Sequence, residues 1–217
     1  MAANLNRGVL SVAVVVGIAL SGCVSSRTHE ETLAELEKAR HAAVQQAAED
    51  EASLAEARRE NERLAARLAE IGQDKLSTKQ SRDRLTITMV DRVLFESGSD
   101  RITAEGMEVL HKVGAVLRDA RDKRILVSGH TDNVQIGPSL RGRFKTNWEL
   151  STSRATSVVR YLVDHAGIAP QSLTAAGHAY TKPVADNESE KGRSQNRRIE
   201  IMLYPKDLVN VVAEDEQ

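Results

Sequence analysis

The sequence has one cysteine, few aromatic residues and no excess of either charge. A single cysteine excludes an internal disulfide bond, so its thiol is a core group, a reactive group or a site of modification. Aromatic residues make up 3% of the chain and the formal net charge is -1, so no overall basic field favours nucleic acid as a partner. The 217 residues provide for one compact domain and additional segments.

The first 22 residues have the pattern of an export signal. Residues 1–7 are polar with one basic side chain, and residues 9–20 contain only apolar residues, glycine and serine. This apolar run is too short to cross a bilayer core of roughly 30 Å, which needs about 20 helical residues. We therefore expect a signal peptide over residues 1–22 rather than a permanent membrane helix.

The apolar run ends at Leu20-Ser21-Gly22-Cys23, which resembles the lipobox of bacterial lipoproteins. The resemblance implies cleavage before Cys23, acylation of Cys23 by fatty acids such as palmitate, and a lipidated N-terminus over residues 23–27. Two or three acyl chains anchor far better than one, because each buried methylene contributes about 0.8 kcal/mol. Val24 stands where lipoproteins of the inner membrane often have aspartate, so the outer membrane is expected. The alternative is an uncleaved apolar N-terminus with an incidental cysteine.

Residues 24–71 contain neither glycine nor proline, and Ala, Glu, Arg and Leu dominate this stretch. These residues favour helix, so we expect a helical stalk over residues 28–72. At about 1.5 Å per residue, an unbroken helix of this length would extend about 65 Å. Gly72 is expected to end the helix, and the polar residues 73–81 are predicted to form a linker.

A heptad repeat runs through the stalk, and most of its core positions are apolar. One core position holds Leu33, Arg40, Ala47, Leu54, Asn61 and Leu68, and the other holds Leu36, Ala43, Asp50, Ala57, Leu64 and Ile71. A buried asparagine can fix the register of a coiled coil, and Asn61 is placed to do so. Because the alanines bury little area, two interpretations stay open. The stalk is a coiled coil that joins copies of the chain, or a solvated single helix, and it is a spacer in both.

Residues 82–205 alternate strand and helix patterns. Period-two alternation and short apolar runs predict strands around residues 85–95, 124–128, 172–176 and 198–204. Apolar residues at helical spacing predict two amphipathic helices, capped by Thr103 and Ser151. The pattern indicates an α/β fold: a two-layer sandwich of a small mixed sheet with two main helices, preceded by the long N-terminal helix. Residues 206–217 are expected to be a tail.

Four motifs in this region resemble the successive signatures of the OmpA-like peptidoglycan-binding domain, the family that includes OmpA, MotB and Pal. They are residues 93–99 (VLFESGS), 129–132 (GHTD), 147–155 (NWELSTSRA) and 196–200 (NRRIE). Residues 144–151 and the long loop before them resemble in particular the version in the flagellar stator protein MotB. The resemblance implies that residues 82–205 bind the stem peptide of peptidoglycan without a covalent bond.

The resemblance also implies which residues bind. Uncrosslinked diaminopimelate carries an ammonium and a carboxylate on one carbon, and by motif position Asp132 and Arg154 correspond to the anion and cation that receive them. A guanidinium can hold a carboxylate through two charge-assisted hydrogen bonds. Arg154 is also expected in the first turn of the second helix, where free N–H groups attract an anion. The rest of the groove corresponds to Phe95, Thr131, Asn147, Leu150 and Arg198.

Several of these residues also have ordinary structural interpretations. A surface Asp–Arg pair contributes under about 1 kcal/mol, and only the motif context favours a binding site. His130 is expected to be a hydrogen-bonding strut, because no second ligand stands at metal-binding spacing. Trp148 and Phe144 are expected to pack under the loop rather than to stack on sugar. Arg197 and Arg198 also fit a solvated strand edge.

The segment of residues 134–146 is longer than in simple members of the family and contains Arg141, Arg143 and Lys145. A mobile, solvated loop is favoured over one that adds contacts to the cell wall.

Together these features predict a lipoprotein that is held in the outer membrane through Cys23 and binds peptidoglycan in the periplasm. The alternative is a MotB-like stator or a wall-anchoring subunit of a larger envelope machine. A stator needs a membrane helix with a proton-carrying carboxylate, and residues 9–20 contain none. A hydrolase built on His130 and Asp132 lacks a nucleophile motif, so no enzyme activity, cofactor or metal is expected.

Overall fold

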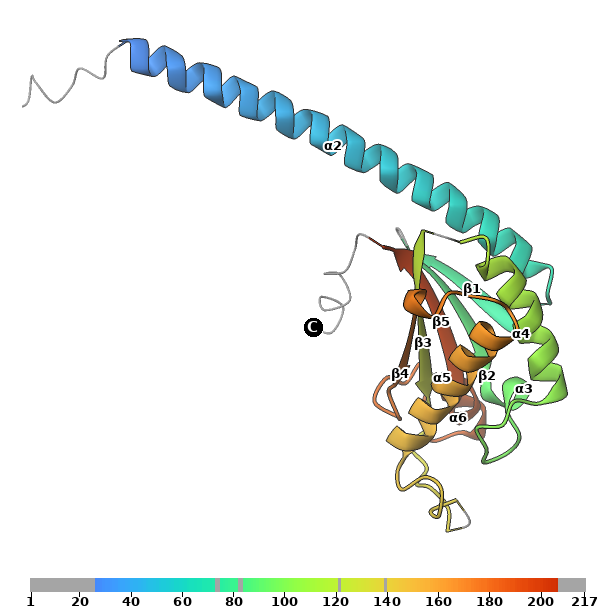
Figure 1. Ribbon diagram of the computed structural model, residues 1–217. Helices are drawn as coiled ribbons and strands as arrows, with labels where there is room; N and C mark the ends of the chain where they lie inside the picture. Colours follow the sequence, from blue (N-terminus) through green and yellow to red (C-terminus); the bar gives the residue numbers. More distant parts are fainter. Residues whose placement is uncertain (1–25, 73–74, 82–83, 121, 139, 207–217) are drawn as a thin grey trace, which may run out of the picture. The chain divides into compact units, whose positions relative to one another are not determined.

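A long helix precedes an α/β domain in the computed structural model of the protein (Figure 1). The structure describes residues 26–72, 75–81, 84–120, 122–138 and 140–206. The chain divides into two units between Ser53 and Leu54. The predicted signal peptide and Cys23 lie outside the described residues, as does the predicted tail except for Lys206.

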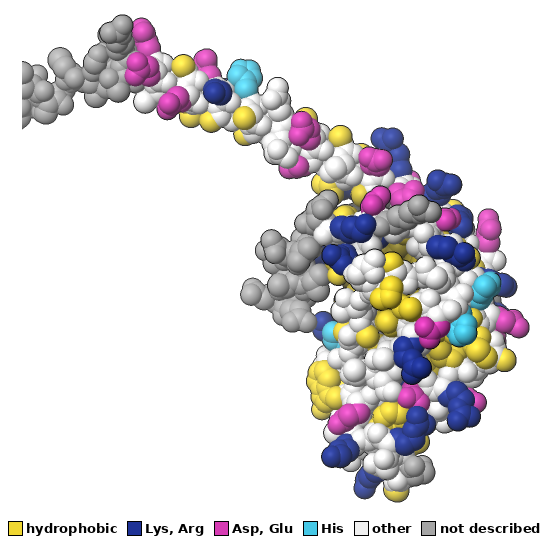
Figure 2. Space-filling view, viewed as in Figure 1, with side chains coloured by type: hydrophobic (Ala, Val, Ile, Leu, Met, Phe, Trp, Pro, Cys, Tyr) yellow, Lys and Arg dark blue, Asp and Glu magenta, His cyan; other side chains and the backbone are white. Residues whose placement is uncertain are grey.

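Helix α2 (Ser26–Ala69) has 44 residues and coincides with the run that lacks glycine and proline. It begins two residues before the predicted start. In the first unit, the described side chains from His29 to Ser53 are all exposed, including Leu36 with 65% of its surface accessible. Figure 2 shows apolar, acidic and basic side chains interspersed along this stretch. Without tertiary packing here, the helix depends on the strong helix propensity of its residues.

The last turns of α2 belong to the second unit and are packed against the domain. Asn61, Leu64 and Leu68 are at most 1% exposed, and the two leucines belong to the main hydrophobic core. The Arg67 guanidinium also pairs with Asp119 at 2.5 Å. The domain of the same chain therefore covers these heptad positions. The prediction that Asn61 sets the register of a coiled coil is wrong, because Asn61 has no surface left for a second helix.

The segment predicted as a polar linker contains a strand. Strand β1 (Leu76–Ser81) pairs antiparallel with β2 (Arg84–Val90), from Leu76 opposite Met89 to Ser81 opposite Arg84. As an edge strand, β1 buries only Leu76, so the alternation of apolar residues that reveals a strand is missing. The Gln80 side-chain amide donates a hydrogen bond to the Arg58 carbonyl of α2 at 3.3 Å, which links this strand to the helix.

The five strands form one mixed sheet in the order β1-β2-β5-β3-β4. Strands β3 (Lys123–His130), β4 (Leu173–Gly177) and β5 (Arg198–Pro205) lie where strands were predicted. Only β3 and β4 pair in parallel. The first predicted strand stops at Val90, because Asp91–Leu94 forms a single helical turn, α3. The mixed sheet is confirmed, with five strands where four were predicted.

Two helices supply the second layer of the sandwich (Figure 1). Helix α4 (Ala104–Leu117) is capped by Thr103, as predicted, whose hydroxyl accepts a hydrogen bond from the Gly106 N–H at 2.9 Å. Helix α5 (Asn147–Asp164) begins five residues earlier than predicted, because Thr146 rather than Ser151 is its N-cap and forms a capping box with Glu149. Both helices bury their apolar faces in the core that contains Leu85, Ile87, Ile125, Val127 and Ile201. The short helices η1 (Pro170–Ser172) and α6 (Glu190–Asn196) complete the domain.

His130 faces the other side of the sheet, where it pairs in register with Arg198. The residue is 3% exposed, and its ring stacks on His178 with the ring centroids 5.0 Å apart. Neither ring nitrogen has a hydrogen-bond partner among the described residues, so the predicted hydrogen-bonding strut is wrong. Burial, together with the Arg198 charge, lowers the pKa of His130 to about 3. The Glu200 carboxylate lies 3.7 Å from His130 Nε2 and pairs with Arg198 at 2.7 Å.

We expect Leu68→Ala to lower the free energy of unfolding by about 2 to 5 kcal/mol, the usual cost of emptying a filled core position. Leu36→Ala in the same helix should change it by less than about 0.5 kcal/mol, because Leu36 is exposed. Urea unfolding followed by circular dichroism measures both. Equal effects of the two substitutions would contradict the docking of the last turns of α2.

The depressed pKa of His130 predicts a loss of stability in acid. As the pH falls, the unfolded chain binds a proton near the ordinary pKa of 6.5, whereas the folded chain does so only near 3. The contribution of neutral His130 is therefore fully present above the ordinary pKa and is lost as the pH falls toward the folded pKa. Between about pH 7.5 and 5, the wild type should lose about 2 kcal/mol more of its free energy of unfolding than His130→Gln. Urea titrations at both pH values measure this difference, and parallel losses would refute it.

Candidate functional site

A cleft of about 630 Å³ opens beside the carboxyl end of β3 and the first turns of α5. Its volume is in the usual range of ligand sites. Six of the seven predicted binding residues line it: Phe95, Thr131, Asp132, Asn147, Leu150 and Arg154. These residues come from three segments that lie far apart in the sequence, which the fold brings together in one place.

The close crossing of α5 over β3 positions the two main charged residues. A Cβ atom on Gly129 would lie 2.1 Å from the Ser151 carbonyl oxygen, so only glycine allows this approach. The chain leaves β3 at Thr131, whose N–H donates to the Ala179 carbonyl at 2.8 Å. The Asn147 side-chain amide then donates to the Val134 carbonyl at 2.9 Å and to the Asp132 carbonyl at 3.3 Å. The start of α5 is thereby fixed to the backbone around Asp132.

Asp132 is held in an ion pair. Its Oδ2 atom lies 2.6 Å from Arg197 Nη1, and its Oδ1 atom accepts a hydrogen bond from the Val134 N–H at 3.1 Å. The other terminal nitrogen of Arg197 lies 2.6 Å from Glu190 Oε1. Burial alone would lower the pKa of Arg197, but its bonds to the two carboxylates raise it above the ordinary value. Arg197 therefore lines the cleft as a fixed cation rather than a solvated edge residue.

Arg154 lies in the wall of the cleft with its side chain 5% exposed. Its Nε–H donates to the Ser99 carbonyl at 2.9 Å, and Nη1 lies 3.1 Å from Asp91 Oδ2. The guanidinium carbon stands 5.2 Å from the centre of the Phe95 ring, which is cation–π geometry. Because α5 begins at Asn147, Arg154 is beyond the first turn, and the predicted help from the helix N-terminus is wrong.

Asp91 and Arg197 line the cleft, although neither was predicted to bind. Burial raises the pKa of Asp91, against the opposing effect of Arg154. The alternation of side chains along the strands could have indicated that both residues face the helices. Asp91 continues the face of β2 that carries Met89, and Arg197 continues the face of β5 that carries Ile199. Both faces point toward the helices.

Arg198, the seventh predicted binding residue, is absent from the described lining of the cleft. It follows Arg197 by one residue and therefore points to the opposite face of the sheet, where it pairs with Glu200. Its Nη2 donates to the Lys182 carbonyl at 3.2 Å, and its side chain is 4% exposed. The alternative of a solvated edge is also wrong for Arg198, which fastens the segment around Lys182 to the sheet.

Residues 134–137 and Leu140, from the segment between Asp132 and Asn147, line one side of the cleft. Ile136, Phe144 and Leu150 make a small hydrophobic cluster with Leu140 against it. Arg143 Nη2 lies 2.5 Å from Asp100 Oδ1, which ties the segment to the turn after Phe95. Most described residues of the segment are exposed, as expected of a solvated loop, but Ile136 and Phe144 are buried in a small core of their own. Phe144 packs as predicted.

Trp148 does not pack as predicted. It remains 49% exposed on the first turn of α5.

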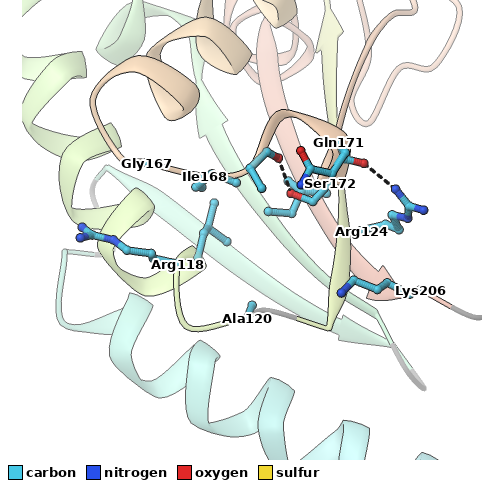
Figure 3. A pocket seen from close by; sticks show the side chains of 11 residues that line it. Arg118, Ala120, Arg124, Gly167, Ile168, Gln171, Ser172 and Lys206 are labelled. Carbon is cyan, nitrogen blue, oxygen red and sulfur yellow. Dashed lines mark hydrogen bonds between the residues drawn. The ribbon is translucent and has the colours of Figure 1, made fainter.

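A second pocket of about 580 Å³ lies at the other end of β3 (Figure 3). Its lining includes the apolar residues Leu117, Ile125 and Ile168 and the basic residues Arg118, Arg124 and Lys206. Arg124 Nη1 donates to the Gln171 carbonyl at 2.5 Å. The described side chains that line this pocket include no carboxylate. The first cleft combines both signs of charge and contains six of the seven predicted binding residues, so it is the candidate binding site.

Comparisons with known proteins agree on the domain that contains this cleft. Residues 94–197 match the family model described as the OmpA family. Motility protein B of Bacillus subtilis is 34% identical over 131 residues, which cover 60% of this chain and 49% of that protein. The outer-membrane lipoprotein YfiB of Pseudomonas aeruginosa is 33% identical over 115 residues, covering 53% of this chain and 64% of YfiB.

A solved structure, described as the cell wall anchor of the T6SS from Pseudomonas aeruginosa, is 35% identical. It superposes with a TM-score of 0.60 over 66% of this chain and 97% of that chain. The chain spans about half the length of the first curated relatives that it matches. The family match, the shared fold and the sequence identity together show that residues 94–197 are a domain of the OmpA family.

Proposed function

We propose that this protein tethers a bacterial membrane to the cell wall by binding the diaminopimelate-containing stem peptide of peptidoglycan. The observation that carries the proposal is the pair of ion pairs in the cleft, Asp132 with Arg197 and Arg154 with Asp91. The carbon of diaminopimelate that bears both an ammonium and a carboxylate requires an anion and a cation in one small site. The relative described as a cell wall anchor supports the same function.

The cleft offers contacts for the rest of the ligand. Charge-assisted hydrogen bonds from a guanidinium to a carboxylate are roughly twice as strong as neutral ones, and Arg154 and Arg197 both supply such donors. The side chains of Phe95, Ile136 and Leu140 give the wall an apolar part. Such a surface suits the methylene chain that joins the two ends of diaminopimelate. Non-covalent binding requires no catalytic group, and the cleft residues are assigned no catalytic role.

The proposed anchor is an acylated Cys23, with the outer membrane as its location and the wall-binding domain in the periplasm. The lipobox-like sequence before Cys23 supports the lipid, and the match to an outer-membrane lipoprotein supports the location. Among residues 26–206, apart from the few that are not described, no helix combines the length and hydropathy of a membrane span. The exposed first part of α2 would act as the spacer, with or without a second copy of the chain.

A second candidate is a wall-anchoring subunit of a larger envelope machine, as in motility complexes. The match to motility protein B favours it. The two candidates share the cleft and differ in the partner of the N-terminal region. Co-purification of stoichiometric inner-membrane proteins with the full chain would favour the machine, and recovery of the acylated protein alone would favour the simple tether.

We expect Asp132→Asn and Arg154→Gln each to weaken binding to diaminopimelate-containing sacculi at least tenfold. Each substitution removes a buried charge-assisted hydrogen bond, worth about 1.5 to 3 kcal/mol. Co-sedimentation of purified protein with sacculi over a concentration series measures the apparent Kd. Arg124→Gln, which changes a cation of the second pocket, is the matched control and should bind like the wild type. If both cleft variants co-sedimented with sacculi as the wild type does, the assignment of the site would be wrong.

Replacement of Cys23 by alanine should abolish lipid attachment, since the proposed acyl chains are joined to this residue. Metabolic labelling with an alkyne-tagged palmitate, followed by fluorophore ligation and gel analysis, measures acylation. The Leu68→Ala protein is the control: it is expected to be less stable but keeps Cys23, so it should still be labelled. Label that persists in Cys23→Ala would exclude the proposed anchor.

A further inference from the structure

Asp91 has an unusual environment for a buried carboxylate. It begins α3 directly after β2, and its N–H donates to the Arg197 carbonyl at 2.9 Å. Its Oδ2 atom pairs with Arg154, yet its Oδ1 atom is buried and has no hydrogen-bond partner among the described residues. A buried polar atom without a partner is rare in folded proteins and costs stability. Asp91 also lines the cleft, so a ligand can supply the missing donor.

The charges around Asp91 identify the donor that fits. Arg154, Arg197 and Asp132 are the charged groups that act on it. Arg154 already forms an ion pair with Oδ2, and Arg197 is paired with Asp132 and Glu190. The torsion that turns a carboxylate about its Cβ–Cγ bond is soft, so the unpartnered oxygen can turn toward the cleft. A cationic donor in the cleft would face two carboxylates, those of Asp91 and Asp132.

We propose that Asp91 is a second receptor for the ligand ammonium, which it binds together with Asp132. The inference rests on the proposed function, because it assigns a partner to one end of the same diaminopimelate. An ammonium has three N–H donors and no acceptor, so it can satisfy both carboxylates at once. Arg154 and Arg197 bind the ligand carboxylate. The bound ligand thus takes over part of the contacts in the Asp91–Arg154 and Asp132–Arg197 ion pairs.

This arrangement makes the site selective for a free amine. Acetylation of the amine removes the positive charge and two of its three donors, so the two carboxylates lose their shared partner. A residue that merely positions Arg154 would behave differently. Its loss would weaken the grip on the ligand carboxylate and would therefore affect amine and acetylated ligands alike. The dependence on the ligand amine distinguishes direct binding by Asp91 from an effect through Arg154.

The experiment compares two ligands with four forms of the protein. The ligands are a muropeptide with uncrosslinked meso-diaminopimelate and the same muropeptide acetylated on the free amine. The proteins are the wild type, Asp91→Asn, Asp132→Asn and Asp100→Asn, and isothermal titration calorimetry gives each Kd. Asp100 is the matched control, because its charge acts on Arg154 while its carboxylate bonds to Arg143 and Ser153 and does not line the cleft.

The wild type should bind the free amine at least tenfold more tightly than the acetylated form. Asp91→Asn and Asp132→Asn should each raise the Kd of the free-amine ligand about tenfold, because each removes a charge-assisted hydrogen bond to the ammonium. The Kd of the acetylated ligand should change by no more than about twofold, because that ligand has no ammonium. Asp100→Asn should keep the preference of the wild type for the free amine and should not weaken one ligand more than the other. Equal weakening of both ligands by Asp91→Asn would overturn the inference, as would unchanged binding of the free amine. If the wild type binds neither ligand, the proposed function itself fails.

A measurement on the wild type keeps the test independent of whether Asp91→Asn folds. The pKa of the Asp91 carboxyl, followed by carbon NMR, should fall when the free amine binds, because an adjacent ammonium favours the ionised form. The acetylated ligand should leave it unchanged. A pKa that does not fall with the free amine would overturn the inference.

Discussion

The site depends on one steric constraint, the close approach of α5 to the end of the sheet. Two glycines make it possible, since a Cβ on Gly129 would meet the Ser151 carbonyl oxygen at 2.1 Å and one on Gly177 would meet the Thr152 hydroxyl at 2.1 Å. With the helix backbone this close to β3 and β4, its inner face lies beside Asp132 and the loop that follows. Residues 134–137 and Leu140 then line one side of the cleft, where Ile136 packs in a small cluster with Leu150 of the same helix.

Charges of alternating sign allow this cleft to be polar and largely buried at the same time. Burying a charge is costly unless a partner is present, and each acid here has a guanidinium as its neighbour. The Asp91–Arg154 and Asp132–Arg197 pairs differ in how fully their partners compensate for the cost of burial. Burial is the largest influence on the pKa of both Asp91 and Arg154, raising the first and lowering the second, so their pairing compensates incompletely. Asp132, by contrast, has a partner for each oxygen.

The sequence was sufficient to predict the sandwich, the positions of four strands and six residues of the cleft, because these depend on local periodicity and on motifs. Prediction from the sequence failed for features that are determined by tertiary contacts. Strand β1 has one buried residue and no alternation, and the capping box at Thr146 moved the start of α5. Arg197 and Arg198 were separable in principle, because Ile199 and Ile201 fix which face of β5 is buried. Asn61 was misassigned because a heptad repeat does not say whether its partner is a second chain or the same one.

The docked end of α2 gives the proposed tether a mechanical property. A load that reaches the last turns of α2 would enter the domain through Leu64 and Leu68, which belong to its hydrophobic core, and through the edge strand β1. Because the two leucines share this core with residues of the sheet, such a load acts on packed apolar side chains. The cleft lies elsewhere on the domain, beside the far end of β3, so strain at the helix contact need not deform the grip on the wall.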